Sequence, residues 1–210
     1  MSHTLHRSGS TESLANDFPM HAMGARGFNR DGCGPRMKHF AEVVLKYPSE
    51  NAGIVGFPPR LTLSNIDEPK YEDSTMVHIV MNSPEELTKC LKELKEEDIG
   101  LSVTVSGVFD LVHQCCIDAG LVPHTVNMSL GVWGATEKYL PKDESVSEIS
   151  SMCGHGMIPF SLVEDAISKI RKGKMTAEQA AAALTPTCTC HIFNTRRAAE
   201  LLKKYELQSE

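Results

Sequence analysis

The sequence of 210 residues contains no long apolar run, and nowhere approaches the roughly 18 consecutive apolar residues that a membrane-spanning helix needs. Aromatic residues are scarce, at 6% of the chain with a single Trp, which leaves few side chains for stacking on nucleic-acid bases. Positive charge is not in excess, because 21 Lys and Arg are outnumbered by 27 Asp and Glu, and the formal charge is -6. We therefore expect neither a membrane span nor a nucleic-acid partner.

The signatures of several enzyme classes are also missing. There is no G-x-G-x-x-G, G-x-x-x-x-G-K, G-x-S-x-G or H-E-x-x-H pattern, so dinucleotide binding, nucleotide-phosphate binding, serine hydrolysis and zinc proteolysis have no local support. The seven cysteines contain no C-x-x-C, which argues against thioredoxin-like and zinc-ribbon sites. Their odd number, with no apolar leader segment after Met1, predicts a reducing, cytoplasmic location instead of a disulfide framework.

What is present is the composition of an ordinary globular protein, with 41% hydrophobic and 23% charged residues. The stretch from Met1 to Arg36 is rich in Ser, His, Arg and Gly and has no sustained hydrophobic period. It is interpreted as a flexible or draped extension (residues 1–36). Residues 37–210 are expected to form a single α/β domain that is long enough to bury its own core.

Hydrophobic periodicity predicts both helices and strands in this domain. Ser83-Pro84-Glu85-Glu86 is a capping box that starts one helix, between a strand before it and a strand after it, so a βαβα unit is expected. The predicted helices of the first part are 37–47, the segment after Ser83, and 108–119. The predicted strands are 54–57, 61–66, 76–81, 101–105, 126–132 and 146–152. The fold expected is α/β, with a mixed, partly parallel sheet, a βαβα core and flanking helices.

Three further helices are predicted to form a C-terminal helical cap. Their start signals are Ser161 with Glu164, Thr176 with Gln179, and Asn194 or Thr195.

Two short segments concentrate soft metal ligands. Cys153 and His155 follow the predicted strand 146–152, and Cys188 and Cys190 lie in the linker before the last helix. Residues at i and i+2 of an extended chain point to the same side, so each pair can act as a two-pronged ligand. Three thiolates and one imidazole match the Cys3His set of tetrahedral zinc. We therefore predict a zinc site at Cys153, His155, Cys188 and Cys190, with His191 in reserve.

These residue types are compatible with more than one kind of site. A site with one open position would be catalytic, with His155 as an acid–base group near metal-activated water or a polarised carbonyl of a small-molecule substrate. Cysteine ligands completed by Cys115 or Cys116 would instead hold an iron–sulfur cluster with a redox role. A non-catalytic regulatory domain with structural zinc and a metal-free thiol enzyme also fit the sequence. His78, inside a predicted strand, is assigned to the core. The oligomeric state does not follow from the sequence.

Overall fold

The computed structural model describes residues 7–123 and 134–206, and the chain divides into two compact units. The sheet unit comprises Leu14–Val126 and the short return segment Thr189–Ile192. The helical unit comprises Met1–Ser13, Asn127–Cys188 and Phe193–Glu210. Neither unit is one continuous stretch of sequence.

Four strands form the sheet, in the order β2-β3-β1-β4, and every neighbouring pair is antiparallel. The expected partly parallel sheet with a βαβα core is therefore wrong. β3 and β4 do run in the same direction, but β1 lies between them and is antiparallel to both. The bounds are β1 Phe18–Met23, β2 Asn51–Ile54, β3 Val77–Met81 and β4 Ser102–Val105.

The strand β1 comes from the stretch that the sequence had suggested was an extension. Phe18, Met20 and Ala22 face the core, while Pro19 and His21 alternate with them. This is the period of two that a strand with one apolar face requires. A proline and a buried histidine on the other face conceal that period from a count of hydrophobic residues.

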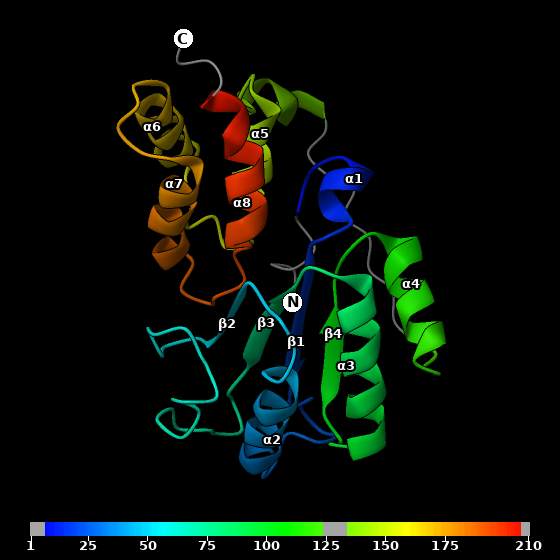
Figure 1. The fold of residues 1–210 in the computed structure, drawn as a ribbon. Helices are drawn as coiled ribbons and strands as arrows, with labels where there is room; N and C mark the ends of the chain where they lie inside the picture. The colour runs from blue at the N-terminus through cyan, green and yellow to red at the C-terminus, as the bar shows by residue number, and fades with distance from the viewer. Residues whose placement is uncertain (1–6, 124–133, 207–210) are drawn as a thin grey trace. The chain divides into compact units, whose positions relative to one another are not determined.

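Three helices cover the apolar face of the sheet, and two of them, α2 and α3, stand in front of the strands in Figure 1. Side chains of these helices pack in one core with those of the strands. The side chain of Ser83 accepts a hydrogen bond from the Glu86 N–H, which confirms the predicted start of α3. The predicted strand 61–66 instead forms turns, in which Asn65 accepts a hydrogen bond from Thr62 N–H. The bounds are α2 Gly34–Val44, α3 Pro84–Glu97 and α4 Phe109–Asp118.

The opposite face of the sheet carries several polar side chains beside Pro19 and Val80, and it is also buried. Asn51, His21 and His78 are at most 1% exposed there. Burying a polar group costs free energy unless it forms hydrogen bonds. These side chains therefore need polar partners, which the side chains on the apolar face do not.

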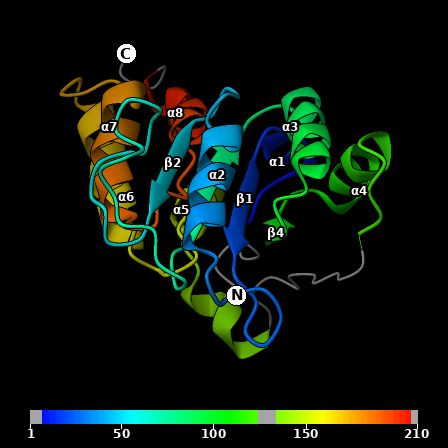
Figure 2. The same cartoon turned by 90° about the horizontal axis from the view of Figure 1, so that it is seen from below.

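Helices alone make up the described part of the helical unit. Within it α7 packs on both α6 and α8, and α5 packs on α6 and α8 (Figure 2). The bounds are η1 Gly134–Tyr139, α5 Glu144–Ser151, α6 Phe160–Arg171, α7 Ala177–Leu184, η2 Thr185–Thr187, α8 Thr195–Leu202 and η3 Lys203–Tyr205. The short α1, Thr11–Leu14, spans the boundary between the units.

The segment predicted as strand 146–152 is in fact the helix α5. Asp143 caps it by accepting a hydrogen bond from Ser145 N–H, and Val146 and Ile149 are its buried stripe at helical spacing. The predicted strand 126–132 lies outside the described residues. None of the described helices is long and apolar enough to cross a membrane.

Candidate functional site

Two of the predicted ligands meet in the helical unit. Cys153 follows α5, and Cys188 follows η2, after the Ala-rich helix α7. Their thiols are hydrogen-bonded to each other, and the two residues are 2% and 1% exposed. All seven cysteines of the chain are buried and none forms a disulfide, so this contact joins two thiols.

The turn after α5 directs backbone donors at one of these sulfurs. The N–H groups of His155 and Met157 point to the Cys153 sulfur. Gly156 makes this path possible with a φ of 68°, a conformation that costs glycine little, and its own N–H donates to the Cys153 carbonyl at 3.0 Å. Backbone N–H groups aimed at a sulfur stabilise its negatively charged form.

The balance at Cys153 nevertheless favours the neutral thiol. The hydrogen bond with Cys188 and then burial raise the pKa of Cys153 well above its ordinary value, while the N–H groups of His155 and Met157 lower it. Two adjacent buried sulfurs cannot both become thiolates without a compensating positive charge.

The other two predicted ligands are placed differently. The side chain of His155 is exposed, and its backbone N–H points to the Cys153 sulfur. Cys190 is buried and belongs to the sheet unit. Within residues 7–123 and 134–206, no three His, Cys, Asp or Glu side chains are grouped closely enough to hold a metal ion together. The prediction that Cys153 lies at a strand end was wrong, because α5 precedes it.

In the sheet unit, the reserve ligand His191 is held by an unusual backbone conformation and by a hydrogen bond from its ring. Its φ of 57° is unusual for a residue other than glycine. Its Nε2 donates to the Phe57 carbonyl oxygen at 3.1 Å, since a carbonyl can only accept. Burial lowers the pKa of His191, which favours the neutral ring with its lone pair on Nδ1.

Two buried histidines lie on the same face of the sheet unit. His21 on β1 and His78 on β3 are direct cross-strand partners, with ring centroids 5.7 Å apart. His78 is in turn the partner of Gly53 on β2, over which the His191 ring sits. Sequence reasoning assigned His78 to the core and overlooked His21. A histidine in each of two apolar strands was the signal that could have found them.

The cysteines considered for completing a cluster are on α4 of the sheet unit. The Cys115 thiol donates to the Pro84 carbonyl at 3.5 Å, and burial raises the pKa of the Cys116 thiol. These contacts are typical of cysteines that pack in a core.

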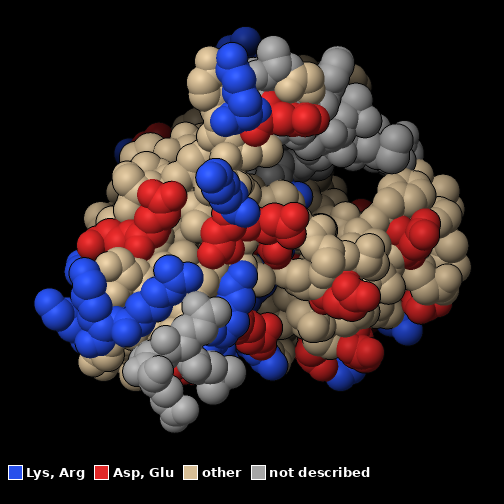
Figure 3. Space-filling model, turned by 90° about the horizontal axis from the view of Figure 1, so that it is seen from above, with Lys and Arg blue, Asp and Glu red and all other residues tan. Residues whose placement is uncertain are grey.

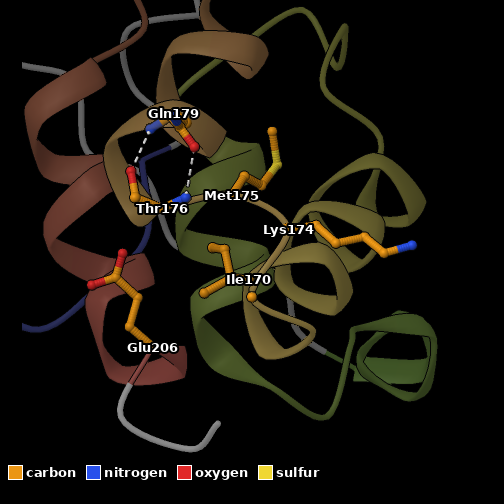
Figure 4. Close-up of a pocket in the computed structure, with 7 residues that line it drawn as sticks. Ile170, Lys174, Met175, Thr176, Gln179 and Glu206 are labelled. Atoms are coloured by element: carbon orange, nitrogen blue, oxygen red, sulfur yellow. Dashed lines mark hydrogen bonds between the residues drawn. The ribbon is translucent and has the colours of Figure 1, made fainter.

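A hollow of about 280 Å³ in the helical unit is a weaker candidate site (Figure 4). Three of its polar side chains are already engaged, because Thr176 and Gln179 cap α7 and Glu206 accepts from Ala177 N–H. The surface seen in Figure 3 carries both signs of charge, with lysine and arginine gathered at one corner. In the helical unit Lys169, Lys203 and Lys204 form ion pairs with carboxylates.

Comparisons with known proteins add no assignment: no family model, no curated protein and no solved structure matches this chain.

Proposed function

We propose that this protein binds a metal ion, with zinc favoured, at a site built on the Cys153 and Cys188 thiols. The observation that carries the proposal is the contact of these two buried thiols, with two backbone N–H groups aimed at one of the sulfurs. His155 and Cys190 complete the proposed ligand set. Cys190 is retained because it is two residues from Cys188, a separation of at most about 7 Å along the chain.

Zinc resolves the electrostatic conflict at this site. A divalent cation supplies the positive charge that two neighbouring thiolates need. The N–H groups of His155 and Met157, which already face the Cys153 sulfur, then stabilise its thiolate form. Zinc also prefers sulfur and nitrogen ligands in tetrahedral geometry. Because binding displaces the thiol protons, the affinity for zinc rises with pH.

Whether the proposed site is catalytic depends on the role of the exposed His155 side chain. If His155 is not a ligand, one position on the ion is open to water or to a carbonyl of a small-molecule substrate, and His155 can act there as an acid–base group. If all four groups bind, zinc is structural and joins segments of the chain that are distant in sequence.

An iron–sulfur cluster is the second candidate. The hydrogen bonds from backbone N–H groups to the Cys153 sulfur favour it, because such bonds tune cluster sulfurs in the same way. A metal-free thiol nucleophile has less support, since the raised pKa of Cys153 works against a reactive thiolate.

Elemental analysis and visible absorption of protein purified without added metal and without oxygen test the proposal. We expect a colourless protein with about one equivalent of zinc. Iron with sulfide and a brown colour would show the cluster instead. Protein with no metal that also fails to take up zinc after chelation would exclude both.

Matched serine variants locate the ion. Cys153→Ser and Cys188→Ser should each lose bound zinc, and Cys190→Ser tests the proposed third thiolate. Cys90→Ser, at a cysteine buried on α3, is the control that should retain the metal. Zinc that is retained in both Cys153→Ser and Cys188→Ser would contradict the assignment.

A further inference from the structure

The two edges of the sheet differ, because the chain covers one of them and leaves the other open. β2 forms the first edge; its four residues are buried, and the Leu61 N–H donates to the Ala52 carbonyl at 2.8 Å. β4 forms the second edge, and there Ser102, Val103 and Thr104 are exposed. An edge strand presents backbone N–H and C=O groups with which a further strand can pair.

The strand register shows which backbone groups of β4 point outward. The Ser106 N–H donates to the Pro19 carbonyl at 2.8 Å, so these two residues form a hydrogen-bonded position of the β1–β4 ladder. Hydrogen-bonded and non-hydrogen-bonded positions alternate along an antiparallel pair. Thr104 therefore bonds to β1, whereas Val103 and Val105 direct their N–H and C=O groups away from it. No residue within 7–123 or 134–206 forms a hydrogen bond with these outward groups.

The β4 edge lacks the features that usually keep edge strands from pairing with their own copies. Those features are lysine, proline, a bulge or an inward-pointing charge. β4 has the sequence Ser-Val-Thr-Val, and no residue from 99 to 109 is charged. Residues 99–123 contain no Lys or Arg, and their only carboxylates are Asp110 and Asp118. Two copies of β4 can therefore meet without repulsion between like charges on the strands.

Exposed apolar side chains accompany this open edge. On β4 itself, Val103 is 38% exposed. The helix α4 begins soon after β4 ends, and both Figure 1 and Figure 2 place it beyond β4, on the side away from β1. Along one face of α4, Phe109 and Ile117 are 49% and 52% exposed, and between them His113 stacks on the Phe109 ring with centroids 5.7 Å apart. Apolar side chains gathered beside an open strand edge are typical of a protein contact surface.

We propose that β4 is a docking edge for a second copy of this chain, which pairs with it antiparallel across a two-fold axis. In this pairing Val103 bonds to Val105 of the second copy and Val105 bonds to its Val103, so the outward groups of both strands form about four hydrogen bonds. Thr104 then lies opposite Thr104 of the second copy. A self-complementary contact of this kind closes as a dimer.

The position of α4 is compatible with this dimer. Each α4 follows the C-terminal end of its own β4. Because the paired strands run in opposite directions, the two α4 helices stand at opposite ends of the contact. Each helix then covers part of the other copy with its exposed Phe109 and Ile117 side chains. This surface lies in the sheet unit and does not depend on the proposed thiol site.

Analytical ultracentrifugation of the full chain, with a chelator present to exclude pairing through metal, tests the dimer. We expect a dimer whose fraction rises with protein concentration. Val103→Pro removes an outward N–H, which edge strands tolerate, and should weaken dimerisation at least about tenfold because each copy loses one donor. Val103→Thr keeps the N–H and the β-branched shape, and Leu63→Lys changes an apolar residue 54% exposed in the turns before β3. Both controls should remain dimeric.

A cysteine placed at the proposed axis gives an independent measurement. Thr104→Cys sets two cysteines opposite each other at a non-hydrogen-bonded position, where Cα atoms are about 4.5 Å apart and a disulfide can form. All seven native cysteines are buried, so mild oxidation with glutathione disulfide should link this variant through residue 104. Ser102→Cys is the matched control: the two copies of residue 102 are offset along the strands, and no covalent dimer should form.

A wild-type chain that stays monomeric at every concentration overturns the inference. So does a Val103→Pro variant that dimerises as strongly as the wild type, or a disulfide that forms at residue 102 instead of residue 104. If circular dichroism shows that Val103→Pro does not fold, Ile117→Lys on the exposed face of α4 carries the same test. A charge at that position should weaken the dimer, and unchanged dimerisation would contradict the proposed contact.

Discussion

Gly53 leaves room for His191 in the sheet unit, and this single pairing fixes where the return segment Thr189–Ile192 lies on the sheet. The imidazole replaces the side chain that a strand residue would normally place beside His78. A hydrogen bond to the Phe57 carbonyl then holds the ring in one orientation. The effect of a methyl group at residue 53 therefore depends on a residue far along the chain.

We expect Gly53→Ala to destabilise the protein by about 1–3 kcal/mol, the usual cost of forcing extra atoms into a packed interior. The same change in a His191→Ala background should cost much less, because the ring that the new Cβ meets at 2.2 Å is absent. Urea unfolding of the four proteins measures this coupling. Equal costs in the two backgrounds would show that the ring does not occupy this space.

At the scale of the element, helix caps show what sequence can and cannot determine. The capping box at Thr176 was predicted and is confirmed, and at Ser83 the predicted cap forms through the hydrogen bond from Glu86 N–H to the serine side chain; both caps need only local residues. Ser161 was predicted to cap α6, but Pro159 is the residue before that helix. Asp143, the cap of α5, was overlooked, and its helix was taken for a strand.

The candidate site, too, could be predicted from the sequence only in part. The concentration of cysteine and histidine around Cys153 and Cys188 predicted that these segments meet, and the two thiols do. The predicted geometry was wrong, since a helix and not a strand leads to Cys153. The place of β1 between β3 and β4 depends on pairing between distant segments, which local periodicity does not encode.

Thr176→Ala should lower the stability of the protein by about 1 kcal/mol, because the Gln179 N–H loses its acceptor at the start of α7. Ser161→Ala, an exposed residue in the first turn of α6, is the matched control and should change stability by less than about 0.5 kcal/mol. Thermal and urea unfolding provide the comparison. A larger loss in the Ser161 variant would restore that residue as the cap.

At the scale of the whole molecule, a buried arginine anchors the N-terminal segment of the helical unit. Arg197 on α8 is 3% exposed and pairs with Glu148 of α5 at 2.9 Å. The same guanidinium donates to the Ser8 carbonyl at 2.7 Å and to the Ser13 hydroxyl at 3.0 Å. One side chain thus joins three parts of the helical unit that are remote in sequence.

Arg197→Ala should destabilise the protein by about 3 kcal/mol, because the largely covered Glu148 carboxylate loses its charged partner and keeps only the Ser13 hydroxyl. Amide exchange of residues 8–13 should become faster in this variant. Arg196→Ala is the neighbouring control: its exposed pair with Glu200 should be worth less than about 0.5 kcal/mol, with no change in exchange. Unchanged protection of residues 8–13 in the Arg197 variant would contradict the anchoring role.

The interleaving of the two units has a consequence for biosynthesis. The sheet unit is complete only after the segment Thr189–Ile192 has been made, and the helical unit needs both residues 7–13 and α8. Domains that are continuous in sequence can fold one after another as they leave the ribosome. Here, a fragment stopped before residue 188 would contain neither unit whole, so neither unit can be completed until the segment from Thr189 onward has been made.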